Sequence, residues 1–255
     1  MKLNIVPART GLTWVKLGVT TFLRQPLALT GLFFMYLAAV LVILQVPMLG
    51  MVLAAMIVPA ATLGLMAATA EASSGRFPMP TVLLSAFRAG RQRGRAMLVL
   101  GAIYTVGSLI ATLLASLLVG GGVDSAADAQ GQTVDLRAMA VLLLHLPLVL
   151  LFWHAPALVH WHGVPPVKSL FFSAVACLRN IGALLVYGCA WVLLFLLAGF
   201  AASALGMLMG GMGVARSIVM PTALVLVAMF STSLYFTFRD SFHADDPQEV
   251  PDAAL

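Results

Sequence analysis

Hydrophobic and polar residues follow one another in long blocks along this chain. No charged residue occurs between Gln25 and Ala70. At about 1.5 Å per helical residue, that run is far too long for one crossing of a hydrocarbon core about 30 Å thick. It therefore predicts a membrane hairpin that turns at Pro47 to Gly50, with spans near residues 27–46 and 49–70.

Four later apolar runs predict four further spans, at residues 96–119, 138–159, 181–209 and 217–238. A polar segment with three Asp and one Arg, residues 120–137, separates the first two of these runs. The pattern predicts an all-α polytopic membrane protein with six transmembrane helices in one domain, residues 1–239. Residues 240–255 are acidic and poor in apolar side chains, which predicts a disordered cytoplasmic tail.

Three shorter amphipathic stretches each precede a predicted hairpin. The first covers residues 9–24, Pro78 and Pro80 open the second, and the third covers residues 168–180. Cations on one side and apolar side chains on the other are typical of helices that lie in the membrane interface. We therefore expect three interfacial helices on the cytoplasmic side, with Trp14 at headgroup depth.

The distribution of Lys and Arg predicts the orientation. Of the 14 cationic residues, only Arg137 and Arg216 fall on one side of the six predicted spans, and the others fall on the opposite side. Because cytoplasmic loops carry the excess of Lys and Arg, both termini are expected in the cytoplasm and residues 120–137 outside it.

The second and third amphipathic stretches and their hairpins repeat each other at an offset of 87 residues. The matched pairs include Pro78 with Pro165, Leu83 with Leu170, Ala96 with Ala183, Gly101 with Gly188, and Tyr104 with Trp191. A looser third copy begins at Arg9. This indicates a three-fold pseudo-repeat of a surface helix and a hairpin, with every copy inserted in the same sense. Transporters with inverted repeats differ in that respect.

Composition supports the membrane assignment, with 62% hydrophobic residues, 9% charged residues and a mean hydropathy of +1.04. Soluble domains carry about 25% charged residues. The cations lie between apolar runs and form no stripe, so membrane lipids are the expected partners and nucleic acid is not. Cys177 and Cys189 imply neither a disulfide framework nor a zinc site, and both are interpreted as small buried residues.

One motif is carried by Ala155, Pro156, Ala157, Leu158 and Val159, followed by Pro166, Ser173, Ala176, Arg179 and Asn180. Together with Gly11, Trp14, Gly18, Phe22 and Pro26, it resembles an uncharacterised family of bacterial six-helix inner-membrane proteins over residues 5–238. The layout is more distantly similar to the membrane domain of some glycerophosphodiester phosphodiesterases, whose catalytic domain has no counterpart here. The resemblance implies a fold and an inner-membrane location, and it implies no activity.

Four of the five histidines fall within eighteen positions, namely His145, His154, His160 and His162. Imidazole binds metals and haem, but His145 and His154 would lie on opposite sides of one helix, and no other span supplies a facing histidine. His160 and His162 are interpreted as interfacial residues beside Trp161. His145, deeper in the span, is expected to hydrogen-bond another helix.

Three methionines, Met207, Met209 and Met212, cluster with glycines at the end of the fifth predicted span. Thioethers bind Cu(I), but Met also fills apolar gaps freely, and packing in a Gly-rich turn is the favoured interpretation. Gly206 and Gly210 form a small-xxx-small pair that leaves open whether the close helix contact lies within the chain or between chains.

Four arginines precede the third predicted span, namely Arg88, Arg91, Arg93 and Arg95, and three of them share a face if one helix carries them all. Cations attract the anionic leaflet by about 1 kcal/mol each. They are therefore predicted to contact anionic lipid. Anchoring and control of topology are favoured over a specific headgroup pocket, which stays the alternative.

No nucleophile with a base and no pair of carboxylates comes together in the sequence, and no predicted span contains an ionised residue. We therefore expect neither an enzyme nor a cofactor. The favoured function is that of an accessory or envelope-organising protein that acts through lipid or protein contacts. The alternative is a carrier or flippase-like transporter of a lipid or amphiphile.

Overall fold

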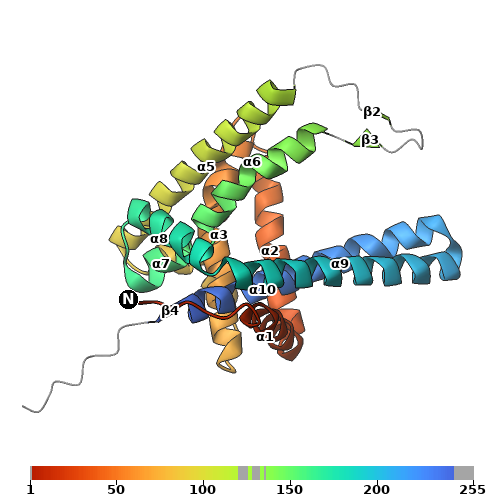
Figure 1. The fold of residues 1–255 in the computed structure, drawn as a ribbon, viewed down its shortest axis with the longest axis horizontal. Coiled ribbons are helices and arrows are strands. Elements are labelled where there is room, and N and C mark those ends of the chain that lie inside the picture. Colours follow the sequence, from red (N-terminus) through yellow and green to blue (C-terminus); the bar gives the residue numbers. More distant parts are fainter. Residues whose placement is uncertain (1, 120–125, 128–132, 135, 244–255) are drawn as a thin grey trace, which may run out of the picture. The chain divides into compact units, whose positions relative to one another are not determined.

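The computed structural model describes residues 2–119, 126–127, 133–134 and 136–243, and these are almost entirely helical (Figure 1). The helices are α1 (Thr10–Arg24), α2 (Pro26–Leu44), α3 (Gly50–Ser73), the 3-10 helix η1 (Pro80–Leu84), α4 (Ser85–Arg88), α5 (Arg91–Val119), α6 (Leu136–Phe152), α7 (Ala155–His162), α8 (Pro166–Arg179), α9 (Ile181–Gly210) and α10 (Met212–Ser241). Short strands β1 (Lys2–Leu3) and β4 (Phe242–His243) pair antiparallel, as do β2 (Ala126–Ala127) and β3 (Thr133–Val134).

Six segments are long and apolar enough to cross a membrane: Pro26–Leu44, Gly50–Ser73, Arg91–Val119, Ala138–His162, Ile181–Gly210 and Met212–Ser241. They confirm the six predicted spans and the all-α class. The third and sixth begin about five residues earlier than predicted, because Arg is a good helix former and nothing interrupts the helix before the apolar run. Arg91, Arg93, Arg95 and Arg216 consequently lie inside helices expected to contain no charge.

The predicted helix that would carry Arg88, Arg91 and Arg95 on one face is wrong. Helix α4 ends at Arg88, and α5 begins at Arg91 after Gly90, whose φ is 103°. A positive φ at glycine leaves the right-handed helix, so the two segments have different axes. Arg88 therefore lies on a separate helix from the other three arginines.

The chain forms two compact units. The first contains Met1–Phe33, Leu65–Val82 and Ala176–Leu255, and the second contains Phe34–Gly64 and Leu83–Val175. Each unit is described below by itself.

In the first unit, α9 and α10 run side by side as a long hairpin, and α1 packs across both (Figure 1). Glycines allow this approach, because a Cβ on Gly11 would meet the backbone of Ala183 and one on Gly18 would meet Ser233. Trp14 lies between these glycines and is fully buried, with its ring edge-on to Tyr187 at 6.1 Å. It therefore packs inside the protein, against α9, and its depth relative to the lipid headgroups stays a prediction.

Residues 240–243 also belong to this unit, whereas the sequence placed them in a disordered tail. Asp240 and Ser241 complete α10, and Phe242 is buried against Phe238 while it pairs with Leu3. These four residues are held by partners from the other end of the chain. Residues 244–255 lie outside the described residues.

In the second unit, α5 pairs with α6 around an apolar core. The core residues come from α3 to α8 and are Ala60, Leu63, Ala86, Met97, Leu100, Leu148, Phe152, Ala155, Val159 and Leu170. Two further close contacts depend on glycine, since Gly64 lies against the backbone of Leu83 and Gly101 against the carbonyl of Met56. Small residues let helix backbones approach where lipid provides no hydrophobic driving force.

Candidate functional site

The motif that begins at Ala155 and Pro156 forms a helix break inside the fourth span. Proline has no amide hydrogen and its ring clashes with the carbonyl four residues earlier. Helix α6 accordingly ends at Phe152, and α7 begins at Ala155, with Ala155 and Pro156 both buried. The span is therefore interrupted at Trp153 and His154.

Ser173 of α8 repairs this break. Its hydroxyl accepts a hydrogen bond from the backbone N–H of His154 at 2.9 Å and donates one to the carbonyl of Leu150 at 2.9 Å. In an unbroken helix, that N–H would donate directly to that carbonyl. The hydroxyl is thus inserted into a single backbone hydrogen bond, and neither backbone group is left unpaired.

The other motif residues lie at the two ends of α8. Pro166 occupies its first turn, a position that proline favours because the first helical N–H has no partner within the helix. Arg179 is exposed at the last turn, and Asn180 is 2% exposed at the junction with α9. The Asn180 amide accepts from the Val6 N–H at 2.9 Å and donates to the Asn4 carbonyl at 3.0 Å. The side-chain amide therefore pairs with one backbone N–H and one backbone carbonyl of the N-terminal segment, as the backbone of a neighbouring β-strand would.

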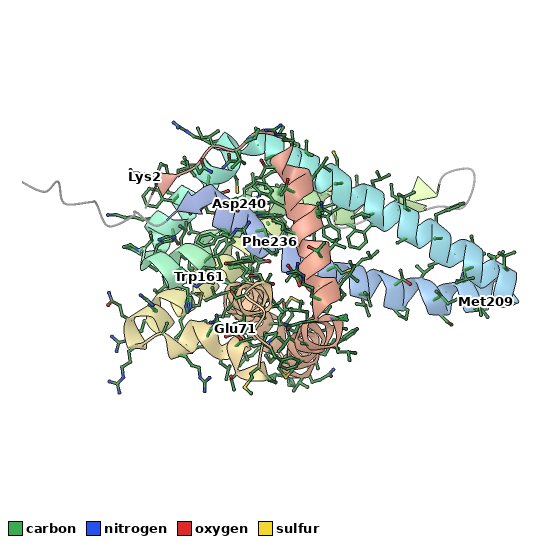
Figure 2. The ribbon with its side chains drawn as sticks, turned by 90° about the horizontal axis from the view of Figure 1, so that it is seen from below. Lys2, Glu71, Trp161, Met209, Phe236 and Asp240 are labelled. Carbon is green, nitrogen blue, oxygen red and sulfur yellow. The ribbon has the colours of Figure 1, made fainter. Side chains whose placement is uncertain are left out.

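A second polar contact joins the two ends of the chain in the first unit. Trp14 donates through Nε1 to the Asp240 carboxylate at 3.0 Å, and Arg239 pairs with the other carboxylate oxygen at 2.9 Å. Lys2 and Asp240 lie at the end of the α9–α10 hairpin opposite Met209 (Figure 2). The sequence did not predict this contact. The spacing of Gly11, Trp14 and Gly18 on one helical face was the available signal for a packed tryptophan.

The four histidines do not converge. His145 Nε2 lies 3.1 Å from the hydroxyl of Ser108 on α5, which confirms the predicted hydrogen bond to another helix, and its Nδ1 lies 2.8 Å from the Val141 carbonyl. His154 is buried at the helix break, and His160 and His162 lie in the last turn of α7. Among the described residues, no group of three His, Cys, Asp or Glu side chains could hold a metal ion.

The α9–α10 hairpin carries an open groove of about 540 Å³ near its tip. Ser203 and Met207 of α9 line it, together with Met212, Ala215, Arg216, Val219, Met220 and Ala223 of α10. Met209 lies at the tip of the hairpin (Figure 2) and is not a lining residue. Gly206 lies against the backbone of Ala215, so its close helix contact is within the chain.

The second unit carries a groove of about 480 Å³ along α5 and α6, and its lining side chains are all apolar or glycine. Separately, the side chains of Arg88, Arg91, Arg93 and Arg95 are all exposed, at the end of α4 and in the first turns of α5. The apolar side chains of Leu84 and Phe87 are also exposed beside Arg88, by 56% and 47%.

The two cysteines differ in their environments. Cys177 is buried and Cys189 is exposed, and neither forms a disulfide. The prediction of two small buried residues is therefore correct for Cys177 and wrong for Cys189, which lies on a span whose outward side chains would face lipid.

Comparison with known proteins adds one relative. The chain is 36% identical over 260 residues to a probable inner membrane protein of Burkholderia thailandensis, and the alignment covers 97% of this chain and 96% of that protein. No protein-family model and no solved structure matches the sequence.

Proposed function

Since this chain belongs to the same family as that inner-membrane protein and is itself a multi-pass inner-membrane protein, we propose that it is an accessory or envelope-organising protein that acts through lipid contacts, without enzymatic activity. One observation carries this proposal. Each of the three peripheral helical segments uses one side for packing and exposes large apolar side chains together with cations on the rest of its surface.

Helix α1 illustrates the pattern. Gly11, Trp14 and Gly18 are buried against α9 and α10, while Leu12 and Leu23 are 56% and 63% exposed beside the exposed Lys16 and Arg24. Exposed leucine is costly in water but favourable at the boundary between headgroups and acyl chains, where the cations meet lipid phosphates. This combination supports an interfacial position for α1.

Helix α8 and the segment before α5 show the same combination of exposed apolar side chains and cations. On α8, Val167 and Phe171 are 70% and 64% exposed beside Lys168, while Ser169 and Ser173 are fully buried. Before α5, Leu84 and Phe87 accompany the four exposed arginines. These surfaces support contact with anionic lipid along one membrane face, and the excess of Lys and Arg favours the cytoplasmic face.

The proposed three-fold repeat has support from matched contacts. Tyr104 and Trp191, which correspond at the offset of 87 residues, each lie edge-on to a phenylalanine of the following span, Phe152 at 5.1 Å and Phe230 at 5.5 Å. Each peripheral segment also contacts a span from another copy: Leu83 meets Gly64, Ser173 meets Leu150, and Gly18 meets Ser233.

The test replaces Arg88, Arg91, Arg93 and Arg95 together by Gln. Removal of about 1 kcal/mol of leaflet attraction per residue is expected to lower the amount of anionic lipid that co-purifies, measured by native mass spectrometry. The single change Arg91→Gln should have a small effect, and four Arg→Lys changes should preserve the parent's lipid content because the charge remains.

Unchanged lipid content in the quadruple Gln variant would contradict the proposal. Loss of a tightly held lipid in the Lys variant would instead indicate recognition of a headgroup by the planar guanidinium. That result, with lipid scrambling in liposomes, would favour the carrier function.

A further inference from the structure

The groove near the tip of the α9–α10 hairpin combines one cation with an apolar floor. Arg216 is its charged lining residue, and Met207, Val219, Met220 and Ala223 supply apolar surface. On α10, Val219, Met220 and Ala223 follow Arg216 by three, four and seven residues, a spacing that places them along the same helical face. The groove therefore continues from Arg216 as an apolar track.

Arg216 is expected to lie at headgroup depth. It and Arg239 are the two arginines of α10, and they are separated by about 34 Å at about 1.5 Å per residue. This separation is close to the hydrocarbon thickness of about 30 Å, and no charged residue lies between them. The two guanidinium groups are therefore expected at the two membrane interfaces, so that the apolar track would run from one of them toward the membrane centre.

A hydroxyl lies at the intermediate depth. Ser203 of α9 lines the groove about one helical turn deeper than Arg216, judged from their distances along the antiparallel helices to the Gly211 turn. A membrane phospholipid carries its groups in the same order: a phosphate at the surface, ester carbonyls below it, and an acyl chain beneath.

We propose that this groove binds one anionic phospholipid, with the phosphate on the Arg216 guanidinium and an acyl chain along Val219, Met220 and Ala223. Guanidinium binds phosphate oxygens through two parallel hydrogen bonds. The site deepens the proposed lipid-contact function, on which it rests. It lies at the end of the first unit opposite Asp240, and it shares no residue with the arginines before α5.

Two other occupants fit less well. A Cu(I) ion could bind the thioethers of Met207, Met212 and Met220, which all line the groove, but the adjacent guanidinium would repel it. The helix of a second copy would cover the apolar track, but it would leave Arg216 without an anionic partner.

The experiment uses the full-length protein in nanodiscs that contain phosphatidylglycerol with a photoreactive diazirine in one acyl chain. Peptide mass spectrometry after irradiation is expected to locate cross-links within residues 203–223. Arg216→Gln should reduce the cross-linking yield about fivefold, as expected for loss of about 1 kcal/mol. Arg216→Lys should retain much of the yield, and Ala223→Trp should block the track.

Arg179→Gln is the matched control, because it removes another exposed arginine and should leave the yield unchanged. A phosphatidylcholine probe with the same acyl chain should label the groove less. Because Arg216 is exposed, its variants should keep the parent's melting temperature, which keeps the test valid if Ala223→Trp fails to fold.

Three results would overturn the inference. These are cross-links outside residues 203–223, equal labelling in Arg216→Gln, or conversion of a dimer to a monomer by the groove variants. The proposed function is tested separately, since loss of lipid from the quadruple variant of Arg88, Arg91, Arg93 and Arg95 should leave this cross-link intact.

Discussion

The hydroxyl of Ser173 replaces the backbone hydrogen bond that an unbroken helix would form between His154 and Leu150. The N–H of His154 and the carbonyl of Leu150 lie in a membrane span, where lipid offers no hydrogen-bond partner. A serine on the packed helix α8 satisfies both groups at once. Contact with α8 therefore stabilises the break at Pro156 inside the span.

Ser173→Ala is accordingly expected to lower the free energy of unfolding by about 1–3 kcal/mol, since two buried hydrogen bonds of the Ser173 hydroxyl are lost. The loss would appear as a lower melting temperature in detergent. Ser169→Ala is the matched control: Ser169 is equally buried on α8, but its hydroxyl donates only to Pro166 within the same helix. Equal destabilisation by the two variants would show that the hydrogen bonds of Ser173 at the helix break do not stabilise the protein specifically.

At the scale of elements, glycines decide which helices come into contact. Gly11 and Gly18 put one face of α1 against α9 and α10, and the intervening Trp14 fills the contact and reaches Asp240. The hydrophobic pattern of α1 predicted the helix correctly but did not predict that Trp14 packs against Tyr187 and binds Asp240. A tryptophan serves equally well at an interface and in a core, and only its partners distinguish the two.

Gly18→Leu should separate α1 from α10, because even a Cβ at this position would overlap Ser233. We expect a cost of about 1–3 kcal/mol and faster amide hydrogen exchange along α1. Gly188→Leu on α9 is the control, since no atom of another helix lies within 4 Å of its added Cβ. If the exchange of α1 responds equally to both variants, the glycine contact does not hold this helix.

At the scale of the whole molecule, an even number of spans requires both termini on one side of the membrane. Reporter fusions after Gly75, after Gly163 and at Leu255 should read cytoplasmic, and a fusion at Ala129 should read periplasmic, because Lys and Arg are concentrated on the cytoplasmic side. A periplasmic reading at Leu255 would mean an odd number of crossings and would exclude six spans.

The six spans could be predicted from the sequence because the length and apolarity of a segment determine whether lipid can accept it. The hydrogen bond of His145 was also predictable, since an isolated polar side chain in a span needs a partner. The break between α4 and α5 could not be predicted in this way. Rules on the length and apolarity of a segment locate membrane spans, but they do not predict that Gly90 takes a positive φ.

The sequence by itself thus determined the class, the spans and the membrane location, which depend on local composition and periodicity. The tertiary structure decided which face of α1 is buried, how Ser173 completes a distant helix, and that Arg216 shares a groove with Ser203 and Met207. These features each join residues from different helices. Their formation depends on how the helices pack, and no local pattern encodes that choice.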